Sequence, residues 1–231
     1  YYENAEDIFK DKDPRFFASI LYPGSPWQNG ELEVRRGIIK NDGSKEAASA
    51  FTDVFSEDPS MKTGGKDGLV MAGDCSRTGF YIKKFMDPTN RVEMDRSETN
   101  FMVFRYAETL LNYAEAAFEL GLKDQALQKV NEVRKRYFSA GDWADVKDKP
   151  GRGFTAFDMD WMLSQWGVEF LNEGRRRRTD LRRFDKFTQG QWWFFGRATD
   201  NGQLYPAKRD RKYEWYPLPA SALLVNQGLI Q

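Results

Sequence analysis

The chain has 231 residues, enough for one large domain or two small ones, and its 35 basic and 35 acidic side chains cancel. This balance excludes a net positive field that would draw the chain to nucleic acid or to an anionic membrane surface. The absence of histidine and the presence of one cysteine, Cys75, exclude histidine-dependent catalysis, the usual zinc sites and an intrachain disulfide.

The first hundred residues are predicted to be loop-rich, because Gly, Pro, Asp, Asn and Ser recur every few positions. Short strands are predicted at residues 16–21, 37–40 and 80–85. The segment Gly64-Gly65-Lys66-Asp67-Gly68 lacks the spacing of a phosphate-binding loop, and we interpret it as a flexible turn. Loops as long as those in this region are usually functional or packed over another layer.

From residue 101 apolar residues recur at steps of three and four, which is typical of one face of a helix. A first helix is predicted to be capped by Thr99 or Asn100 and ended by Gly121, and a second helix follows to about Arg136. Together they have the length of a tetratricopeptide unit. The residues predicted on the inner faces are Val103, Tyr106, Ala107, Leu110, Leu111, Ala114, Ala117, Phe118, Ala126, Val130, Val133 and Tyr137.

Residues 141–155 are predicted to form a charged loop, and a third helix is predicted to start after Asp158, a residue type that caps helices. Gly174 is predicted to stop or bend it, and a short helix is predicted at residues 180–184. Residues 189–231 are predicted to be an aromatic loop. The apolar stripe of the third helix consists of Met159, Met162, Leu163, Trp166 and Phe170.

The strongest charge feature is the arginine run at residues 175–178, followed by Arg182 and Arg183. A nucleic-acid patch is one interpretation. Because carboxylates lie close by in the sequence, we favour structural ion pairs that hold a helix and a turn together. These carboxylates are Glu169, Glu173, Asp180 and Asp185.

Two kinds of acidic site stay open. Glycoside hydrolysis needs only two carboxylates, but no spacing among the 35 acidic residues singles out a pair. Loop Asp and Asn residues are calcium ligands by type, but the twelve-residue EF-hand pattern is absent. We therefore predict no catalytic residue and no cofactor, and we leave a structural calcium ion open.

The segment from Tyr22 to Gly30 combines stiffening Pro and Gly residues with two large aromatic rings. Sugar rings have an apolar C–H face that stacks on such aromatics, so Tyr22 and Trp27 are candidate stacking surfaces. Gln28 and Asn29 supply hydrogen-bond donors and acceptors for sugar hydroxyls. The alternative is that Trp27 fills a loop-rich core and touches no ligand.

Six segments, in order along the chain, together resemble the C-terminal half of the SusD/RagB family. The segment from residue 104 to 116 is the closest match, and the others are specific mainly in combination. The segments are Asp13-Pro14-Arg15-Phe16-Phe17; Thr78-Gly79-Phe80-Tyr81-Ile82-Lys83-Lys84-Phe85; Phe104-Arg105-Tyr106-Ala107-Glu108-Thr109-Leu110-Leu111-Asn112-Tyr113-Ala114-Glu115-Ala116; Ala126-Leu127-Gln128-Lys129-Val130-Asn131-Glu132-Val133-Arg134; Glu169-Phe170-Leu171-Asn172-Glu173-Gly174-Arg175 with Asp180-Leu181-Arg182-Arg183-Phe184; and Trp215-Tyr216-Pro217-Leu218-Pro219.

This resemblance implies a mainly α fold, with tetratricopeptide-like helical pairs, long loops and a few short strands. Residues 1–231 would form one C-terminal SusD/RagB-like domain, and the N-terminal half of the family's chain would be absent from this sequence. Within the domain, residues 1–100 would be the ligand side, residues 101–136 the helical pair, and residues 158–231 the late helix and C-terminal loops.

The resemblance also implies a non-catalytic protein that binds oligosaccharide, or peptide in some branches, on the extracellular face of the outer membrane. A lipid anchor on the missing N-terminus would hold it there, and a SusC-like TonB-dependent transporter would be its partner, with no nucleic acid involved. A peptide-binding member, a glycoside hydrolase and a generic helical scaffold for other proteins are the alternatives.

The predicted roles follow from this interpretation. Ligand contact is assigned to the four residues from the 22–30 segment, and residues 192–195 are expected in a core or interface. Structural roles are assigned to Asp13, Arg15, Asp180 and Arg182. Helix packing is assigned to Phe104, Tyr106, Leu110 and Tyr113.

Overall fold

The computed structural model describes residues 5–68, 75–76, 78–93, 96–151, 153–173, 176–186, 192–195 and 204–207. It is mainly helical with short strands, as predicted. The chain divides into two compact units, Tyr1–Gly174 and Arg175–Gln231, and each is described by itself. A search of the described residues finds no helix that is both long enough and apolar enough to cross a membrane.

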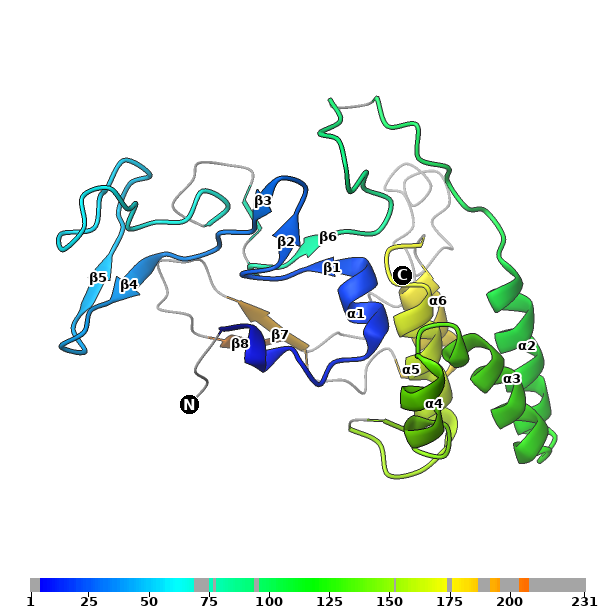
Figure 1. Cartoon of the computed structure of the whole chain (residues 1–231). Helices are drawn as coiled ribbons and strands as arrows, with labels where there is room; N and C mark the ends of the chain where they lie inside the picture. Colours follow the sequence, from blue (N-terminus) through cyan, green and yellow to red (C-terminus); the bar gives the residue numbers. More distant parts are fainter. Residues whose placement is uncertain are drawn as a thin grey trace, which may run out of the picture. The chain divides into compact units, whose positions relative to one another are not determined.

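The predicted helical pair is confirmed. Helices α2 (Tyr106–Glu119) and α3 (Lys123–Lys135) pack side by side (Figure 1). Gly121 ends α2 as predicted: it has a φ of 77°, and its N–H donates to the Phe118 carbonyl at 3.0 Å. The next N–H, that of Leu122, donates to the Ala117 carbonyl at 2.9 Å, which completes a Schellman motif. The buried side chains of the pair are small or branched: Ala107, Leu110, Leu111, Ala114, Ala117, Ala126, Val130 and Val133.

The beginning of α2 differs from the prediction. The helix starts at Tyr106, after Arg105 in an extended conformation, and neither Thr99 nor Asn100 caps it. Arg105 turns inward to the carboxylates described below, so its neighbours on either side face outward. Phe104 is 82% exposed and Tyr106 is 73% exposed, so the packing roles predicted for both are wrong.

Tyr113 also lies on the outside of the pair. Its side chain is exposed, its hydroxyl donates to Gln125 Oε1 at 3.0 Å, and the Lys129 ammonium lies over its ring. The packing role predicted for Tyr113 is therefore wrong, whereas Leu110 is buried as predicted. The three- and four-residue period identified the helix, but the amphipathic aromatics at its margin remain in water.

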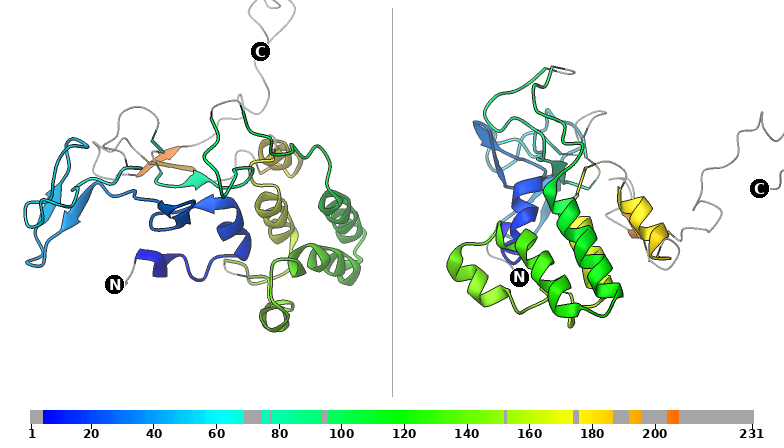
Figure 2. Two further views of the ribbon diagram at one scale, coloured as in Figure 1. Left: turned by 45° about the horizontal axis from the view of Figure 1, so that its top comes forward. Right: turned by 90° about the vertical axis from the view of Figure 1, so that its right-hand side faces the viewer.

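Helix α5 (Met159–Glu169) packs against α2 (Figure 2). Asp158 caps it as predicted, because its side chain accepts a hydrogen bond from the Trp161 N–H at 2.8 Å. The predicted stripe is buried or packed against the core, and Trp161, which was not predicted, is buried with it. Two polar residues of the same helix, Gln165 and Glu169, are buried too.

The loop predicted at residues 141–155 contains a short helix, α4 (Ala140–Val146), so that prediction is wrong in part. Ser139 caps α4 by accepting a hydrogen bond from the Asp142 N–H at 3.2 Å. The cap and the packing of Trp143 on Phe138 and on the Arg134 guanidinium stabilise this short helix. The charge and glycine content of the segment had instead indicated a loop.

Before residue 14 the structure has a short 3₁₀ helix, Ala5–Ile8. The strand predicted at residues 16–21 is wrong over its first part. Asp13 caps helix α1 (Pro14–Ser19), and proline fits the first helical turn. Only β1 (Ile20–Leu21) is a strand, and it pairs antiparallel with β6 (Tyr81–Ile82), which is shorter than predicted.

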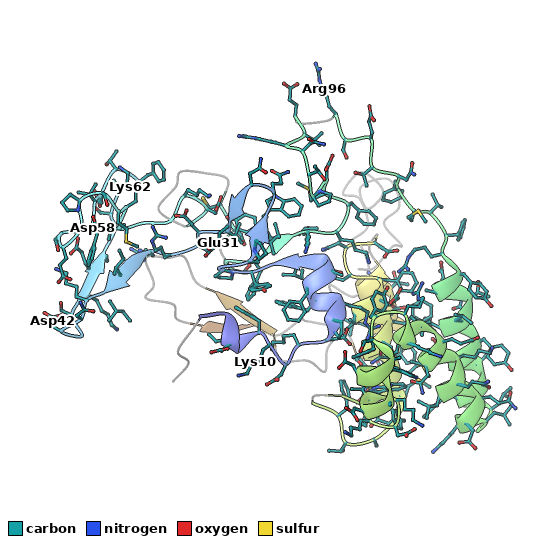
Figure 3. The ribbon with its side chains drawn as sticks, in the orientation of Figure 1. Lys10, Glu31, Asp42, Asp58, Lys62 and Arg96 are labelled. Carbon is teal, nitrogen blue, oxygen red and sulfur yellow. The ribbon has the colours of Figure 1, made fainter. Side chains whose placement is uncertain are left out.

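Two hairpins follow in the loop-rich region: β2 (Pro26–Trp27) with β3 (Gly30–Glu31), and β4 (Gly37–Ile39) with β5 (Lys45–Ala47). The strand predicted at residues 37–40 is thus confirmed. Figure 3 labels Asp42 at the turn between β4 and β5 and Glu31 on β3.

The second unit contains α6 (Arg176–Arg183), so the short helix predicted at residues 180–184 is present but starts four residues earlier. The unit also contains a hairpin of β7 (Trp192–Phe195) with β8 (Leu204–Ala207). The aromatic loop predicted from residue 189 is therefore wrong for β7 and β8. Gly174 and the predicted Pro-x-Pro segment at residues 215–219 lie outside the described residues.

Candidate functional site

A hollow of about 800 Å³ lies in the loop-rich part of the first unit. Its wall comes from three pieces of chain: the β2–β3 hairpin, the turn at residues 66–67, and the segment after β6. The sequence predicted only the first of these pieces. The central lining residues are Trp27, Gln28, Asn29, Lys66, Asp67, Phe85, Met86, Asp87 and Asn90.

Trp27 stands on β2 directly before a two-residue hairpin turn. It is half-buried and pairs with Gly30 across the hairpin. Gln28, the first residue of the turn, has a φ of 49°, the left-handed conformation that two-residue hairpin turns require at this position. The ring is therefore held by a tight hairpin at the edge of the hollow, and it is not a fully buried plug.

Gln28 connects the hairpin to the segment after β6. Its Nε2 donates to the carbonyl of Asn90 at 2.8 Å and to that of Asp87 at 3.2 Å. The Asp87 carboxylate accepts hydrogen bonds from the N–H groups of Thr89 and Asn90, which close a turn and lower the pKa of Asp87. The Gln28 amide nitrogen thus joins two pieces of the wall of the hollow. Asn29 is exposed at the turn.

Tyr22 is not part of the wall of this hollow. Its ring packs against Phe9, Phe16 and Phe17, with centroid distances of 4.7, 5.6 and 5.8 Å. The structure therefore brings together three of the four residues predicted to bind ligand and places the fourth in an aromatic cluster outside the lining.

The glycine-rich turn supports the second piece of wall. The Gly65 N–H donates to the Arg35 carbonyl at 2.9 Å, and the Asp67 N–H donates to the Glu33 carbonyl at 3.0 Å. A Cβ at Gly65 would lie 2.2 Å from the Glu33 carbonyl oxygen. The segment is a turn, as predicted, but its glycines are there for close backbone approach, and hydrogen bonds hold it in place.

A cluster of buried charges lies at the C-terminal end of α5 and just beyond it, and we call it the Glu169–Glu173 cluster. The Glu169 side chain is fully buried and accepts hydrogen bonds from Arg105 Nη1 at 2.8 Å, Arg136 Nη2 at 2.8 Å and the Tyr137 hydroxyl at 3.1 Å. Arg15 Nη1 lies 3.5 Å from its other oxygen. Burial alone would raise the pKa of Glu169, but these guanidinium groups, Arg105 foremost, hold the pKa below its ordinary value.

Glu173 completes the cluster. Its carboxylate binds Arg105 Nε at 2.7 Å and the Lys84 ammonium, which follows β6. The sequence had suggested the arginine run at residues 175–178 as partner of these acids. The described partners are cations far from α5 in the sequence, and the side chains of that run lie outside the described residues.

Asp13 and Arg15 have the contacts that a structural role would require. Arg15 is 3% exposed, and its guanidinium donates to both carboxylate oxygens of Asp13, at 2.9 and 2.8 Å. Its Nη2 also donates to Gln165 Oε1 at 2.9 Å. Burial would raise the pKa of Asp13, but the hydrogen bonds and charge of Arg15 lower it. In the second unit, Asp180 pairs with Arg183 at 3.2 Å, and Arg182 is half-buried on α6; structural roles for Asp180 and Arg182 stay a prediction.

Metal ligation has no geometric support in the part of the chain that the structure describes. Within it, no group of three or more Asp, Glu, Cys or His side chains is arranged to hold a metal ion.

Comparison with known proteins identifies the family. The sequence pattern of the SusD family matches residues 1–231, the whole chain. The chain belongs to the SusD family. The resemblance drawn from the sequence segments is thereby confirmed.

A curated relative of this SusD-family chain is the starch-binding protein SusD of Bacteroides thetaiotaomicron. The two are 31% identical over 135 residues, which are 58% of this chain and 21% of the relative. The match thus spans about a fifth of the relative's length. No solved structure matches the chain significantly.

Some residues of the hollow escaped prediction from the sequence of this SusD-family chain. Phe85 and Met86 are followed by Asp87-Pro88-Thr89-Asn90, an aromatic residue and a turn signal like those of the Trp27 segment. That repeated composition was the available signal. It did not indicate that the two segments face one hollow, because the pairing of β1 with β6 and the Gln28 bridge are long-range contacts.

Proposed function

We propose that this chain binds an oligosaccharide in the hollow beside Trp27, without transforming it. The observation that carries the proposal is a half-buried indole, held by a tight hairpin, at the edge of a hollow of about 800 Å³ lined by amide and charged side chains. A flat aromatic face suits the C–H face of a sugar ring, and amides suit hydroxyl groups.

The roles within the site differ from residue to residue. Trp27 stacks on a sugar ring, and Asn29 donates and accepts hydrogen bonds at the exposed turn. Gln28 contributes its side-chain oxygen, since its nitrogen is engaged with the opposite wall. Tyr22 supports the hairpin from the aromatic cluster behind it, and this is a change from direct ligand contact.

Family membership and the starch-binding relative support carbohydrate as the ligand class. On the same basis we propose that the protein acts at the extracellular face of the outer membrane, held by a lipid anchor. There it would deliver its ligand to a SusC-like TonB-dependent transporter. The helical pair would serve as the scaffold for this assembly.

A hydrolytic function has less support from the site. Glycoside hydrolysis requires a carboxylic acid whose pKa is raised so that it can donate a proton. Among the lining carboxylates, Asp87 accepts hydrogen bonds from the N–H groups of Asn90 and Thr89, which lower its pKa, and this shift is opposite to the one that a proton donor needs. We therefore propose binding alone.

The test is a calorimetric titration of the chain with maltoheptaose and with a panel of other neutral and acidic oligosaccharides. Trp27→Ala is expected to weaken binding roughly tenfold or more, and Trp27→Phe to weaken it less, because a smaller aromatic face remains. Phe104→Ala is the control, since Phe104 is exposed outside the hollow. Equal affinity of Trp27→Ala and the unaltered chain would contradict the assignment of the site.

A peptide-binding member of the same family is the second candidate. The charged lining residues Lys66, Asp67, Glu31 and Arg91 would suit peptide backbone and termini as well as sugars. A library of short peptides titrated under the same conditions separates the two. Tight peptide binding without oligosaccharide binding would replace the first proposal with this one.

A further inference from the structure

The wall opposite Trp27 begins at a residue that is tied to the helical core. Lys84 follows β6, and its ammonium binds the Glu173 carboxylate and donates to the Glu169 carbonyl oxygen at 3.0 Å. The Glu173 side chain is 6% exposed and that of Lys84 is 22% exposed, so the ion pair is partly shielded from water. The hydrogen bond from the Lys84 ammonium to the Glu169 carbonyl is charge-assisted, and such bonds are stronger than those between neutral groups.

The residue after Lys84 has a conformation that needs support. Phe85 has a φ of 68°, which is uncommon for a residue with a side chain. Such conformations persist where the surrounding contacts dictate them, and they concentrate at ligand sites. Phe85, Met86 and Asp87 then form the wall of the hollow.

The wall is held at two further points. At its start, the N–H groups of Lys83 and Lys84 donate to the Ser19 carbonyl, at 2.9 and 3.2 Å. In its middle, Gln28 binds the carbonyls of Asp87 and Asn90. The Lys84 side chain links the start of this wall to the end of α5, where the Glu169–Glu173 cluster lies.

We propose that Lys84 is a positioning residue of the binding hollow. Its ion pair with Glu173 fixes the left-handed turn at Phe85 and thereby sets the distance between the wall and Trp27. The expected effect of Lys84 on ligand affinity rests on the proposed function of the hollow. Its expected effect on the conformation of the wall does not.

The test uses the whole chain with Lys84→Met, which keeps the aliphatic stem and removes the charge, and Lys84→Arg, which keeps the charge. Lys83→Met is the matched control, because the Lys83 ammonium binds the Phe17 carbonyl at 3.0 Å and does not line the hollow. Two measurements need no ligand: amide hydrogen exchange of residues 85–92, and the fluorine NMR signal of Trp27 after fluorotryptophan labelling, assigned with Trp27→Phe. Maltoheptaose titration is the third.

Lys84→Met is expected to speed amide exchange in residues 85–92 roughly tenfold and to shift the Trp27 signal, with α2, α3 and α5 unchanged. Lys84→Arg is expected to show the amide exchange and the Trp27 signal of the unaltered chain. Lys83→Met is expected to leave both measurements unchanged. If Lys84→Met does not fold, the double variant Lys84→Met with Glu173→Met removes both partners of the pair and is expected to give the same two changes.

Three outcomes overturn the proposal: wild-type exchange at residues 85–92 in Lys84→Met, an equal rise of exchange in the helices, or no rescue by Lys84→Arg. If maltoheptaose binds and Trp27→Ala abolishes binding while Lys84→Met leaves affinity unchanged, positioning fails and the proposed function stands. If no probe binds the unaltered chain but the exchange and fluorine changes appear, the proposed function fails and the tether to the wall stands.

Discussion

Arg105 and Glu169 form an ion pair, 2.8 Å from Nη1 to Oε1, that joins the N-cap residue of α2 to the last residue of α5. The Glu169 side chain is fully buried, and burial of a carboxylate is costly unless positive charges and hydrogen bonds compensate. Arg105 also reaches the Glu169 carbonyl at 3.1 Å, so one guanidinium binds both the side chain and the backbone at the end of the helix.

Replacement of Glu169 by Gln is expected to lower the free energy of unfolding by about 3–5 kcal/mol, because it leaves several guanidinium groups facing a neutral side chain in a buried site. Urea denaturation followed by circular dichroism measures the change. Glu132→Gln is the control: Glu132 pairs with Lys129 at the surface, where removal of one partner changes stability by about 1 kcal/mol or less. Equal effects of the two variants would show that the cluster is not a stabilising centre.

The same cluster predicts how stability depends on pH. The pKa values of Glu169 and Asp13 are lowered in the folded chain, below ordinary values of 4.5 and 3.8. At pH values above these ordinary pKa values, the ionised carboxylates of both residues stabilise the folded state. This stabilisation is lost as the pH falls through their lower pKa values in the folded chain. Melting temperatures measured from about pH 7 to pH 3 should fall steeply below about pH 4.5. The difference in melting temperature between the unaltered chain and Glu169→Gln should become smaller over the same pH range. A difference that stays constant with pH would contradict this prediction.

Arg134 gives a prediction about geometry. Its guanidinium is buried between the rings of Trp143 and Trp161, 5.6 Å from each centroid. It donates to the carbonyls of Val146 and Lys149, at 3.3 and 3.0 Å, and these carbonyls lie at and beyond the end of α4. Arg134→Lys keeps the charge but loses the planar guanidinium group, which stacks on the two rings and donates to the two carbonyls. It is therefore expected to destabilise the chain by about 1–3 kcal/mol.

Thermal unfolding measures that loss, and hydrogen exchange at residues 140–150 shows whether it is local. The neighbouring exposed residue supplies the control, since Lys135→Arg should change stability by no more than about 0.5 kcal/mol. Faster exchange confined to residues 140–150 is the expected signature of Arg134→Lys. Unchanged exchange there would mean that α4 does not depend on the guanidinium.

Two glycines should respond in opposite directions to alanine. A Cβ at Gly65 meets the Glu33 carbonyl at 2.2 Å, so Gly65→Ala forces the backbone apart and is expected to cost about 1–3 kcal/mol. It should also weaken maltoheptaose binding, because Lys66 and Asp67 form part of the hollow. Gly141 lies in α4 with nothing within 4 Å, so Gly141→Ala should stabilise by about 0.5–1 kcal/mol. Chemical denaturation of both variants measures whether the free energy of unfolding falls for Gly65→Ala and rises for Gly141→Ala.

The sequence alone determined the family, the helical pair and two of the helix ends. Gly121 and Asp158 could be assigned because helix ends depend on local chemistry: a left-handed residue after the last turn, and a side-chain oxygen before the first. The prediction failed where two local signals compete. Asp13 and Pro14 start a helix in a stretch whose aromatic residues favour a strand, and Ser139 starts α4 in a stretch read as loop.

Only the tertiary structure decided which distant residues meet. The sequence grouped Tyr22 with Trp27, yet the first packs among phenylalanines and the second borders the hollow, because a turn closed by the Ser25 N–H and the Tyr22 carbonyl, 2.9 Å apart, separates them. It paired Glu169 and Glu173 with nearby arginines, whereas Arg15, Lys84, Arg105 and Arg136 reach them from other elements. Local periodicity reports which face of an element is apolar, but ion pairs and hollows depend on distances set by chain packing, and these do not follow from separation along the sequence.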